Sequence, residues 1–177
     1  MNNYWTKRQI QQRINLLDKT INDTDVELAS QYLRSAKKLK AKLESLYKDI
    51  LLDKDADTLL VSDLYKYNRY YDLLADINKE LERLNTKEVE ILGKQLPNMY
   101  KENHKLLNKQ MALNNKINKD QVEHAVNSIW CADGKNWSTR IWSNTNLLRN
   151  KLEASLVDAV ATGRSVDNLT KEIMADF

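Results

Sequence analysis

Apolar residues recur at steps of three and four along most of this chain, the spacing that places side chains on one face of an α-helix. Residues 4–21 have a helix-compatible pattern, and Thr24 and Glu27 then match a capping box that would begin a new helix. We therefore expect a helix over 4–21, a break, and a second helix ending near Leu52. The buried face of that second helix is predicted to be Leu28, Tyr32, Ser35, Leu39, Leu43, Leu46 and Ile50.

A second group of apolar series follows a predicted connection at 53–58. Its first series ends at Leu84, and Asn85-Thr86 is typical of an N-cap, so a further helix is expected after it. Pro97 lies inside that helix and predicts a kink, because the apolar spacing stays in phase across it. The first series is Leu60, Leu64, Tyr67, Tyr71, Leu74, Ile77, Leu81 and Leu84, and the second is the seam of Val89, Leu92, Leu96, Met99, Asn103, Leu106, Gln110 and Leu113.

The last third of the chain predicts shorter helices. Residues 114–119 break the pattern, 120–130 read as a short helix, and 132–135 read as a turn around Gly134. Ser138 is expected to cap a helix that ends with a left-handed residue at Gly163, and Ser165 is expected to cap a final helix from Val166 to about Asp176. The buried face of the helix after Ser138 is predicted to be Ile141, Leu148, Leu152, Leu156 and Val160.

No segment has the alternating pattern of a strand, so the predicted class is all-α. Long amphipathic helices in 1–116 would form an extended bundle or hairpin, and 117–177 would form a smaller helical lobe. Composition agrees, since 3 Gly and 1 Pro are too few for the turns of a β protein. One Cys, a start without an apolar signal segment and no long apolar run lead us to expect a protein made in the cytoplasm without a membrane span.

Charge is unevenly distributed along the chain. Residues 1–50 and 101–150 each carry a net +4, whereas 51–100 carry −3 and 151–177 carry −2. Cations that recur on one helical face can bind the phosphates of double-stranded DNA without reading its sequence, although they are also typical of a solvated polar face. The residues that could contact nucleic acid are a first basic group, Arg34, Lys37, Lys38 and Lys42, and a second basic group, Lys101, Lys105 and Lys109.

The sequence predicts no catalytic, metal-binding or cofactor-binding residues. His104, His124 and Cys131 are the candidates for such chemistry, but no two of them have the spacing that places two ligands on one ion. Three isolated Gly cannot build a phosphate loop. We therefore expect no cofactor and no small-molecule substrate, and we interpret the chain as non-enzymatic.

Aromatic residues concentrate in two places. Around Arg69, the spacing assigns Tyr67 and Tyr71 to the core and leaves Tyr70 and Arg69 for a partner surface. The second place is residues 129–148, where a helix end, a Gly turn and a helix start follow one another. We expect three Trp rings to fasten that corner, with Trp137 packing on Trp142 or its neighbours as a hydrophobic staple. The residues of this corner, or of a partner surface there, are Trp130, Trp137, Arg140 and Trp142.

The same segment resembles the phage Mu F-like head morphogenesis proteins, which are minor head (minor capsid) proteins of tailed phages. The chain start, Tyr4-Trp5-x-x-Arg8, is similar to the opening of many Gram-positive phage and prophage members. The long helices up to Tyr100 resemble the N-terminal half of the same family. The most specific run is Trp130-x-x-Asp133-Gly134-x-x-Trp137-Ser138-x-Arg140-Ile141-Trp142-x-Asn144, followed by Leu148, Leu152, Leu156, Gly163 and Ser165.

The resemblance implies a structural virion component that associates with the portal protein during head assembly, with capsid or scaffolding protein as further partners. It would lie in the host cytoplasm first and then in the phage head or at the portal vertex. Some members bind DNA, and members usually continue into a further C-terminal region. The alternative is a helical adaptor that binds only protein, through the apolar seam from Val89 to Leu113, and has no DNA contact.

Overall fold

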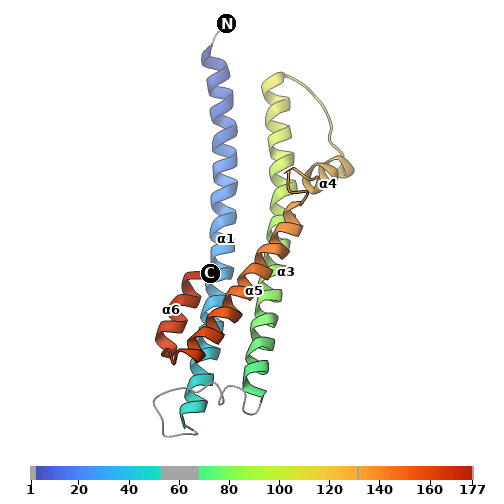
Figure 1. Cartoon of the computed structure of the whole chain (residues 1–177). Helices are drawn as coiled ribbons and strands as arrows, with labels where there is room; N and C mark the ends of the chain where they lie inside the picture. Colours follow the sequence, from blue (N-terminus) through green and yellow to red (C-terminus); the bar gives the residue numbers. More distant parts are fainter. Residues whose placement is uncertain (1–2, 53–67, 131, 177) are drawn as a thin grey trace. The chain divides into compact units, whose positions relative to one another are not determined.

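A computed structural model describes residues 3–52, 68–130 and 132–176 of the 177-residue chain. Within these ranges the protein is all-α and contains no strand, which confirms the predicted class (Figure 1). The helices are α1 (Asn3–Leu52), α3 (Arg69–Met111), α4 (Lys119–Asn127), α5 (Trp137–Ala161) and α6 (Val166–Asp176). The connection predicted at 53–58 and the start of the apolar series at Leu60 lie outside the described residues.

The chain divides into two compact units, and each is discontinuous in sequence. Unit 1 comprises Met1–Ala29 and Glu88–Arg140, and unit 2 comprises Ser30–Lys87 and Ile141–Phe177. Residues of α1, α3 and α5 therefore belong to both units. This grouping differs from the expected division into 1–116 and 117–177, which stays a prediction.

The helix break predicted at Thr24 is wrong, because α1 runs through this position. Thr24 is buried, and its hydroxyl donates to the Thr20 carbonyl oxygen at 2.7 Å, one turn back along the helix. Threonine satisfies its hydroxyl in this way inside helices, so the capping-box pattern does not end the helix here. The predicted buried face of the later part of α1 is confirmed at Ser35, Leu39 and Leu43; the side chain of Ile50 lies outside the described residues.

The N-cap predicted at Asn85-Thr86 is also wrong. The side chain of Asn85 is fully buried and accepts a hydrogen bond from the Thr145 hydroxyl at 3.3 Å, while the Thr86 hydroxyl donates to the carbonyl oxygen of Glu82. Asn85 thus pairs across a helix interface instead of capping a helix end. Pro97 lies within α3, which is one helix from Arg69 to Met111, and the predicted kink stays a prediction.

The later helices begin and end close to the predicted positions, with two differences. Asn118, with Gln121, forms the capping box of α4, and that helix ends at Asn127, before Trp130. The start of α5 is capped by Asn136, whose side-chain oxygen accepts from the Thr139 backbone N–H at 2.9 Å, and not by Ser138. Gly163 has the predicted left-handed conformation, with φ of 65°, after the end of α5.

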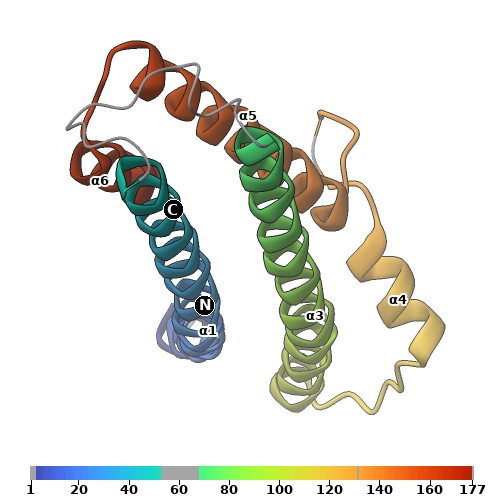
Figure 2. The same ribbon diagram turned by 90° about the horizontal axis from the view of Figure 1, so that it is seen from below.

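Unit 2 has a dense apolar core. Here α5 begins beside α3, and α6 lies beside α1 (Figure 2). Apolar residues from all four helices meet, and the Ser165 hydroxyl caps α6 as predicted. Leu81 and Leu169 are fully buried, and Ala159, which the pattern did not predict, is buried as well. The core residues are Leu39, Leu43, Tyr47, Leu73, Ile77, Leu81, Leu152, Leu156, Ala159, Leu169 and Ile173.

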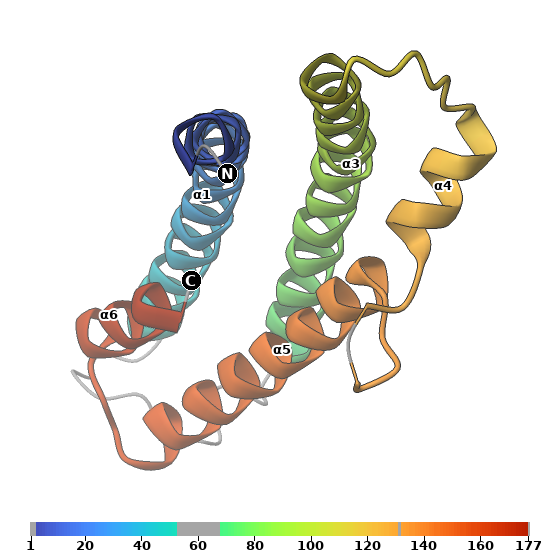
Figure 3. The ribbon, with the colours of Figure 1, turned by 90° about the horizontal axis from the view of Figure 1, so that it is seen from above.

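In unit 1, α3 lies between α1 and α4 (Figure 3). Its contacts with α1 include hydrogen bonds donated by long side chains. Arg13 Nε donates to Asn103 Oδ1 at 3.2 Å, and Gln110 Nε2 donates to the Gln9 carbonyl oxygen at 3.1 Å. Ile91 and Val122 are the buried hydrophobic residues in the described part of this unit. Unit 1 therefore holds together with much less buried apolar surface than unit 2.

Candidate functional site

Unit 1 contains an apolar cavity of about 340 Å³. One wall is Leu17 of α1, and the opposite wall is formed by α4 and the chain that follows it. Trp130 borders the cavity and is 71% exposed. The lining residues are Leu17, Leu96, Met99, Tyr100, Asn103, Ala125, Val126, Trp130 and Trp137. A concave, mostly apolar surface with an exposed Trp at its border is typical of a site that receives an apolar side chain or helix of a partner.

The seam predicted from Val89 to Leu113 lies along this part of α3. Its residues are half-buried from Val89 to Gln110, and Leu113 is 45% exposed. Leu96, Met99 and Asn103 form the α3 side of the apolar cavity, and Leu106 and Gln110 face the Gln12 side of α1. The seam is thus partly covered by α1 and α4 and partly open to solvent.

The Trp-rich corner is built differently from the prediction. Trp130 and Trp142 are 71% and 47% exposed, so the expectation that three buried rings fasten the corner is wrong. Only the half-buried Trp137 has that role. Its indole N–H donates to Asn127 Oδ1 at 3.2 Å, and a Cβ added at Gly93 would lie 3.6 Å from its ring. The ring therefore connects the end of α4 to α3 within unit 1.

Polar contacts hold the turn itself. Asp133 Oδ1 accepts from Arg140 Nη2 at 2.8 Å and from the Lys135 backbone N–H at 3.2 Å. Gly134 has φ of 70°, a conformation that a residue with a Cβ rarely adopts. The Asp-Gly and Arg of the quoted motif thus fix the connection between α4 and α5. Cys131, the remaining rare residue of the segment, lies outside the described residues.

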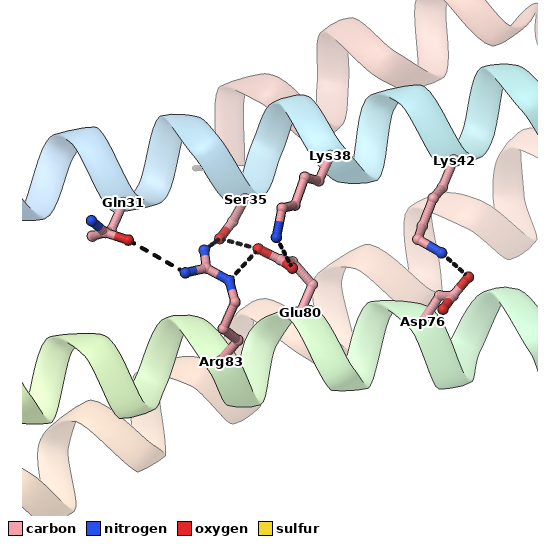
Figure 4. Close-up of polar contacts among 7 residues, drawn as sticks. All are labelled: Gln31, Ser35, Lys38, Lys42, Asp76, Glu80 and Arg83. Carbon is pink, nitrogen blue, oxygen red and sulfur yellow. Dashed lines mark hydrogen bonds and ion pairs between the residues drawn. The ribbon is translucent and has the colours of Figure 1, made fainter.

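The first basic group is partly used inside unit 2 (Figure 4). Lys38 Nζ lies 3.1 Å from Glu80 Oε2, and Lys42 forms an ion pair with Asp76. Arg34 and Lys37 are exposed. Two of the four cations are therefore neutralised by carboxylates of α3, which the spacing along α1 alone could not show, because their partners are about 34 to 42 residues away.

Glu80 is the centre of a buried polar network (Figure 4). Its carboxylate accepts from the Ser35 hydroxyl at 2.9 Å and from Arg83 Nε at 2.8 Å, and Arg83 Nη2 also donates to the Ser35 hydroxyl oxygen. Burial alone would raise the pKa of Glu80. The hydrogen bonds from Arg83, Lys38 and Ser35, together with the charge of Arg83, outweigh it and lower that pKa. The network keeps Glu80 ionised and ties α1 to α3.

The second basic group lies on the surface of unit 1. Lys101, Lys105 and Lys109 are all exposed, and Lys105 Nζ is 2.5 Å from Glu102 Oε1. The Lys105 side chain is 71% exposed even in this pair, so solvent screens the attraction strongly. This group is a more accessible cationic surface than the first.

The tyrosine assignment is reversed in the structure. Tyr71 is 61% exposed, whereas Tyr70 is half-buried and packs against the unit 2 core. The two rings contact edge to face with centroids 5.7 Å apart. The first three residues of the series that placed Tyr71 in the core, Leu60, Leu64 and Tyr67, lie outside the described residues. Within α3 the later members Ile77, Leu81 and Leu84 are buried as predicted, and Leu73 is buried in place of Tyr71.

The two histidines line the same cavity of unit 1 although they are on different helices. His104 and His124 both line a polar, open cavity of about 880 Å³ between α3 and α4, with Asp120 and Asn118. Within the described ranges, no group of three or more His, Cys, Asp or Glu is placed to hold a metal ion. No helix in those ranges is long and apolar enough to cross a membrane.

Comparison of the chain with protein-family models, with curated proteins and with solved structures finds no match. The description of the site therefore depends on the residues and geometry given above.

Proposed function

We propose that this chain is a structural, non-enzymatic minor head protein of a tailed phage or prophage, and that it binds the portal protein during head assembly. The observation that carries the binding role is the apolar cavity of unit 1 with the exposed Trp130 at its border. The identity of the partner is taken from the resemblance of the Trp130–Asn144 run to the Mu F-like head morphogenesis proteins. Its place is then the host cytoplasm during assembly and afterwards the virion.

The chemistry of the cavity favours a helical or apolar segment of a protein as its occupant. Leu96 and Met99 supply a flexible apolar floor, and Ala125 is small enough to let a partner side chain approach α4 closely. A Trp at the border of such a groove contributes a large apolar area with little loss of conformational entropy, and Trp is enriched among residues that dominate binding energy. The portal is accordingly expected to insert an amphipathic helix beside Trp130.

A pull-down with the purified portal protein encoded beside this gene tests the proposal. We expect Trp130→Ala to weaken binding about tenfold or more, since truncating an interface Trp commonly costs above 1.4 kcal/mol. Trp142→Ala is the matched control, because it removes the same side chain at an exposed position of unit 2 that does not line the cavity. Equal loss in both variants, or no binding by the unmodified protein, would contradict docking through this cavity.

Contact with packaged DNA is the second part of the proposal. The second basic group, with Arg34 and Lys37 of the first, supplies exposed cations at protein surfaces. Lys101→Glu with Lys109→Glu should weaken binding to duplex DNA and lower the slope of log affinity against log salt by about 2, or about 0.9 for each lost phosphate contact. Lys38 and Lys42 should matter less, because Glu80 and Asp76 already neutralise them.

The alternative is an adaptor that binds only protein through the seam from Val89 to Leu113. It shares the apolar cavity with the first proposal but predicts no affinity for DNA. The half-buried state of the seam supports it, since the exposed part is still available to a partner. Absence of DNA binding at low salt, together with retained portal binding, would favour a minor head protein without DNA contact; absence of both would favour the adaptor.

A further inference from the structure

The first part of α1 carries an exposed apolar stripe, which we call the α1 stripe: Ile10, Ile14, Leu17 and Ile21. Ile10, Ile14 and Ile21 are 51%, 42% and 49% exposed, and Leu17 is half-buried. Their spacing of four, three and four residues is that of a seam which another helix covers. Branched apolar side chains grouped in this way on a surface usually mark an interaction site.

The α1 stripe is separate from the face of α1 that contacts α3. In unit 1 that contact uses Gln9, Gln12 and Arg13, which pair with Gln110 and Asn103. At about 100° of rotation per residue, the stripe is turned by roughly 100° from these residues. Leu17 is the one stripe residue that also borders the apolar cavity. The stripe therefore needs an occupant other than α3.

The spacing of the stripe reads the same in both directions. A two-fold axis between residues 15 and 16 would set Ile10 against Ile21 of a second copy, and Ile14 against Leu17 of that copy. Such self-complementarity is what a symmetric dimer interface requires. The arrangement places only apolar side chains in the seam.

The net charges of the two halves of this segment favour the same antiparallel pairing, and Lys7, Asp18 and Asp25 flank the stripe at about 100° of rotation per residue. Residues 1–15 carry Lys7, Arg8 and Arg13 and no acidic residue, whereas 16–29 carry four acidic residues and one basic residue, Lys19. An antiparallel arrangement sets each basic half against an acidic half, and a parallel one sets like charges together. The acidic residues are Asp18, Asp23, Asp25 and Glu27.

We propose that the α1 stripe is a dimer interface, in which the first part of α1 pairs antiparallel with the same segment of a second copy of this chain. The occupant is a second copy because the symmetric spacing and the opposite net charges of its two halves make this segment complementary to itself. The proposal does not rest on a portal partner. Variants at Ile10, Ile14 and Ile21 avoid the shared residue Leu17, so dimer formation and cavity binding can be separated.

Sedimentation equilibrium of the full chain tests the interface. We expect a dimer at micromolar concentrations, and we expect Ile14→Glu to raise its dissociation constant about tenfold or more, because the seam would bury an unpaired charge. Val26→Glu is the matched control: Val26 is 73% exposed on the same helix, on a face roughly opposite to the stripe. A monomeric unmodified protein, or equal weakening by both variants, would overturn the proposal.

Charge exchange tests the orientation. Lys7→Glu, and separately Asp25→Lys, should each weaken self-association, because these two side chains flank the stripe and each variant opposes like charges at both ends. Mixing the two variants should give a heterodimer tighter than either homodimer, since both ends are then complementary. Failure of the mixture to associate better than its components would contradict the antiparallel arrangement.

A distance measurement separates the two orientations directly. In a Cys131→Ser background, nitroxide labels at Asn15 and at Ala29 report the spacing between copies. An antiparallel dimer places the two Ala29 positions about 40 Å apart along the helix axis and the two Asn15 positions close together, at about 1.5 Å of rise per residue. Short distances at both positions would indicate a parallel pair and would refute the proposal.

Discussion

Units 1 and 2 use residues of the same long helices, yet they bury them very differently. In unit 2, Leu39 and Leu43 of α1 are 2% and 1% exposed, whereas in unit 1, Ile10 and Ile21 of the same helix are about half exposed. Among described residues, Ile91 and Val122 are the buried hydrophobic positions of unit 1, and all the others belong to unit 2.

The difference indicates that unit 2 contributes mainly to stability and unit 1 mainly to binding. Buried apolar area is the main favourable contribution to folding, so unit 2 should supply most of the stability. Unit 1 keeps its apolar side chains at the surface, in the apolar cavity and the α1 stripe, where a partner can cover them. Local opening should accordingly cost less free energy in unit 1 than in unit 2.

The largest expected effect comes from truncating matched leucines. Leu156→Ala removes a side chain that is 1% exposed in the unit 2 core, and we expect it to lower the free energy of unfolding by about 3 kcal/mol. Leu96→Ala makes the same change at the half-buried border of the apolar cavity and should cost about 1 kcal/mol. Urea unfolding followed by circular dichroism measures both. Similar losses would show that unit 1 has a core as important as that of unit 2.

The second prediction concerns the polar network of unit 2. Glu80→Gln removes the charge that Arg83 and Lys38 pair with, and should cost about 2 kcal/mol near neutral pH. The pKa of Glu80 is lowered in the folded protein, so its contribution is fully present above the ordinary value of 4.5 and is lost as the pH falls through the lowered pKa.

The pH dependence supplies the control for that prediction. The difference in stability between the unmodified protein and Glu80→Gln should shrink below about pH 4.5, because protonated Glu80 and Gln are both neutral. Glu44→Gln, on the exposed i,i+4 pair with Lys40, should give only a small, nearly pH-independent change. A Glu80 effect that persists unchanged in acid would mean that shape, and not charge, holds the network.

The third prediction compares two glycines with the same backbone constraint. Gly134 of unit 1 and Gly163 of unit 2 have φ of 70° and 65°, and a Cβ at either would meet open space. Alanine should therefore cost about 1 kcal/mol locally at each. Gly163→Ala should lower global stability, because it strains the junction between α5 and α6 in the core unit. Gly134→Ala should instead speed hydrogen exchange in the chain near Asn136 and leave global unfolding almost unchanged; a global loss at both would remove the distinction between the units.

Structure is predicted correctly from sequence where it depends only on the residues of one helix face or one turn. Three predictions depend on local spacing and backbone conformation, and all are confirmed: the all-α class, the core face through Leu39 and Leu43, and the left-handed Gly163 after α5. The helix starts predicted at Thr24 and Asn85 are wrong because Thr and Asn side chains can also form hydrogen bonds inside a helix or to another helix. Thr24 bonds within its own helix, and Asn85 bonds to Thr145, a partner that no local pattern reveals.

The candidate site was less predictable for the same reason. The basic spacing of Lys38 and Lys42 does not show that α3 places Glu80 and Asp76 against them. The rare residues draw attention to the Trp-rich segment, but spacing could not show that Trp130 is exposed and borders a cavity with Leu17, more than a hundred residues away. The exposure of Ile10 and Ile14 likewise depends on the rotation of α1 against α3.

The smallest expected effect compares two exposed ion pairs with the same geometry. Arg140 Nη2 lies 2.8 Å from Asp133 in unit 1, and Arg164 Nη1 lies 2.8 Å from Glu172 in unit 2, with all four side chains close to 40% exposed. Solvent screens both pairs, so Asp133→Asn and Glu172→Gln should each change the free energy of unfolding by about 0.5 kcal/mol or less. Asp133 also accepts from the Lys135 backbone N–H, whereas the further partner of Glu172 is the Ser155 hydroxyl. Only the Asp133 variant should therefore increase hydrogen exchange in the turn and weaken portal binding through Trp130. If Asp133→Asn left both the exchange and the binding unchanged, the turn would not position Trp130. The structural role of the corner would then depend on Trp137 and its hydrogen bond to Asn127 at the end of α4.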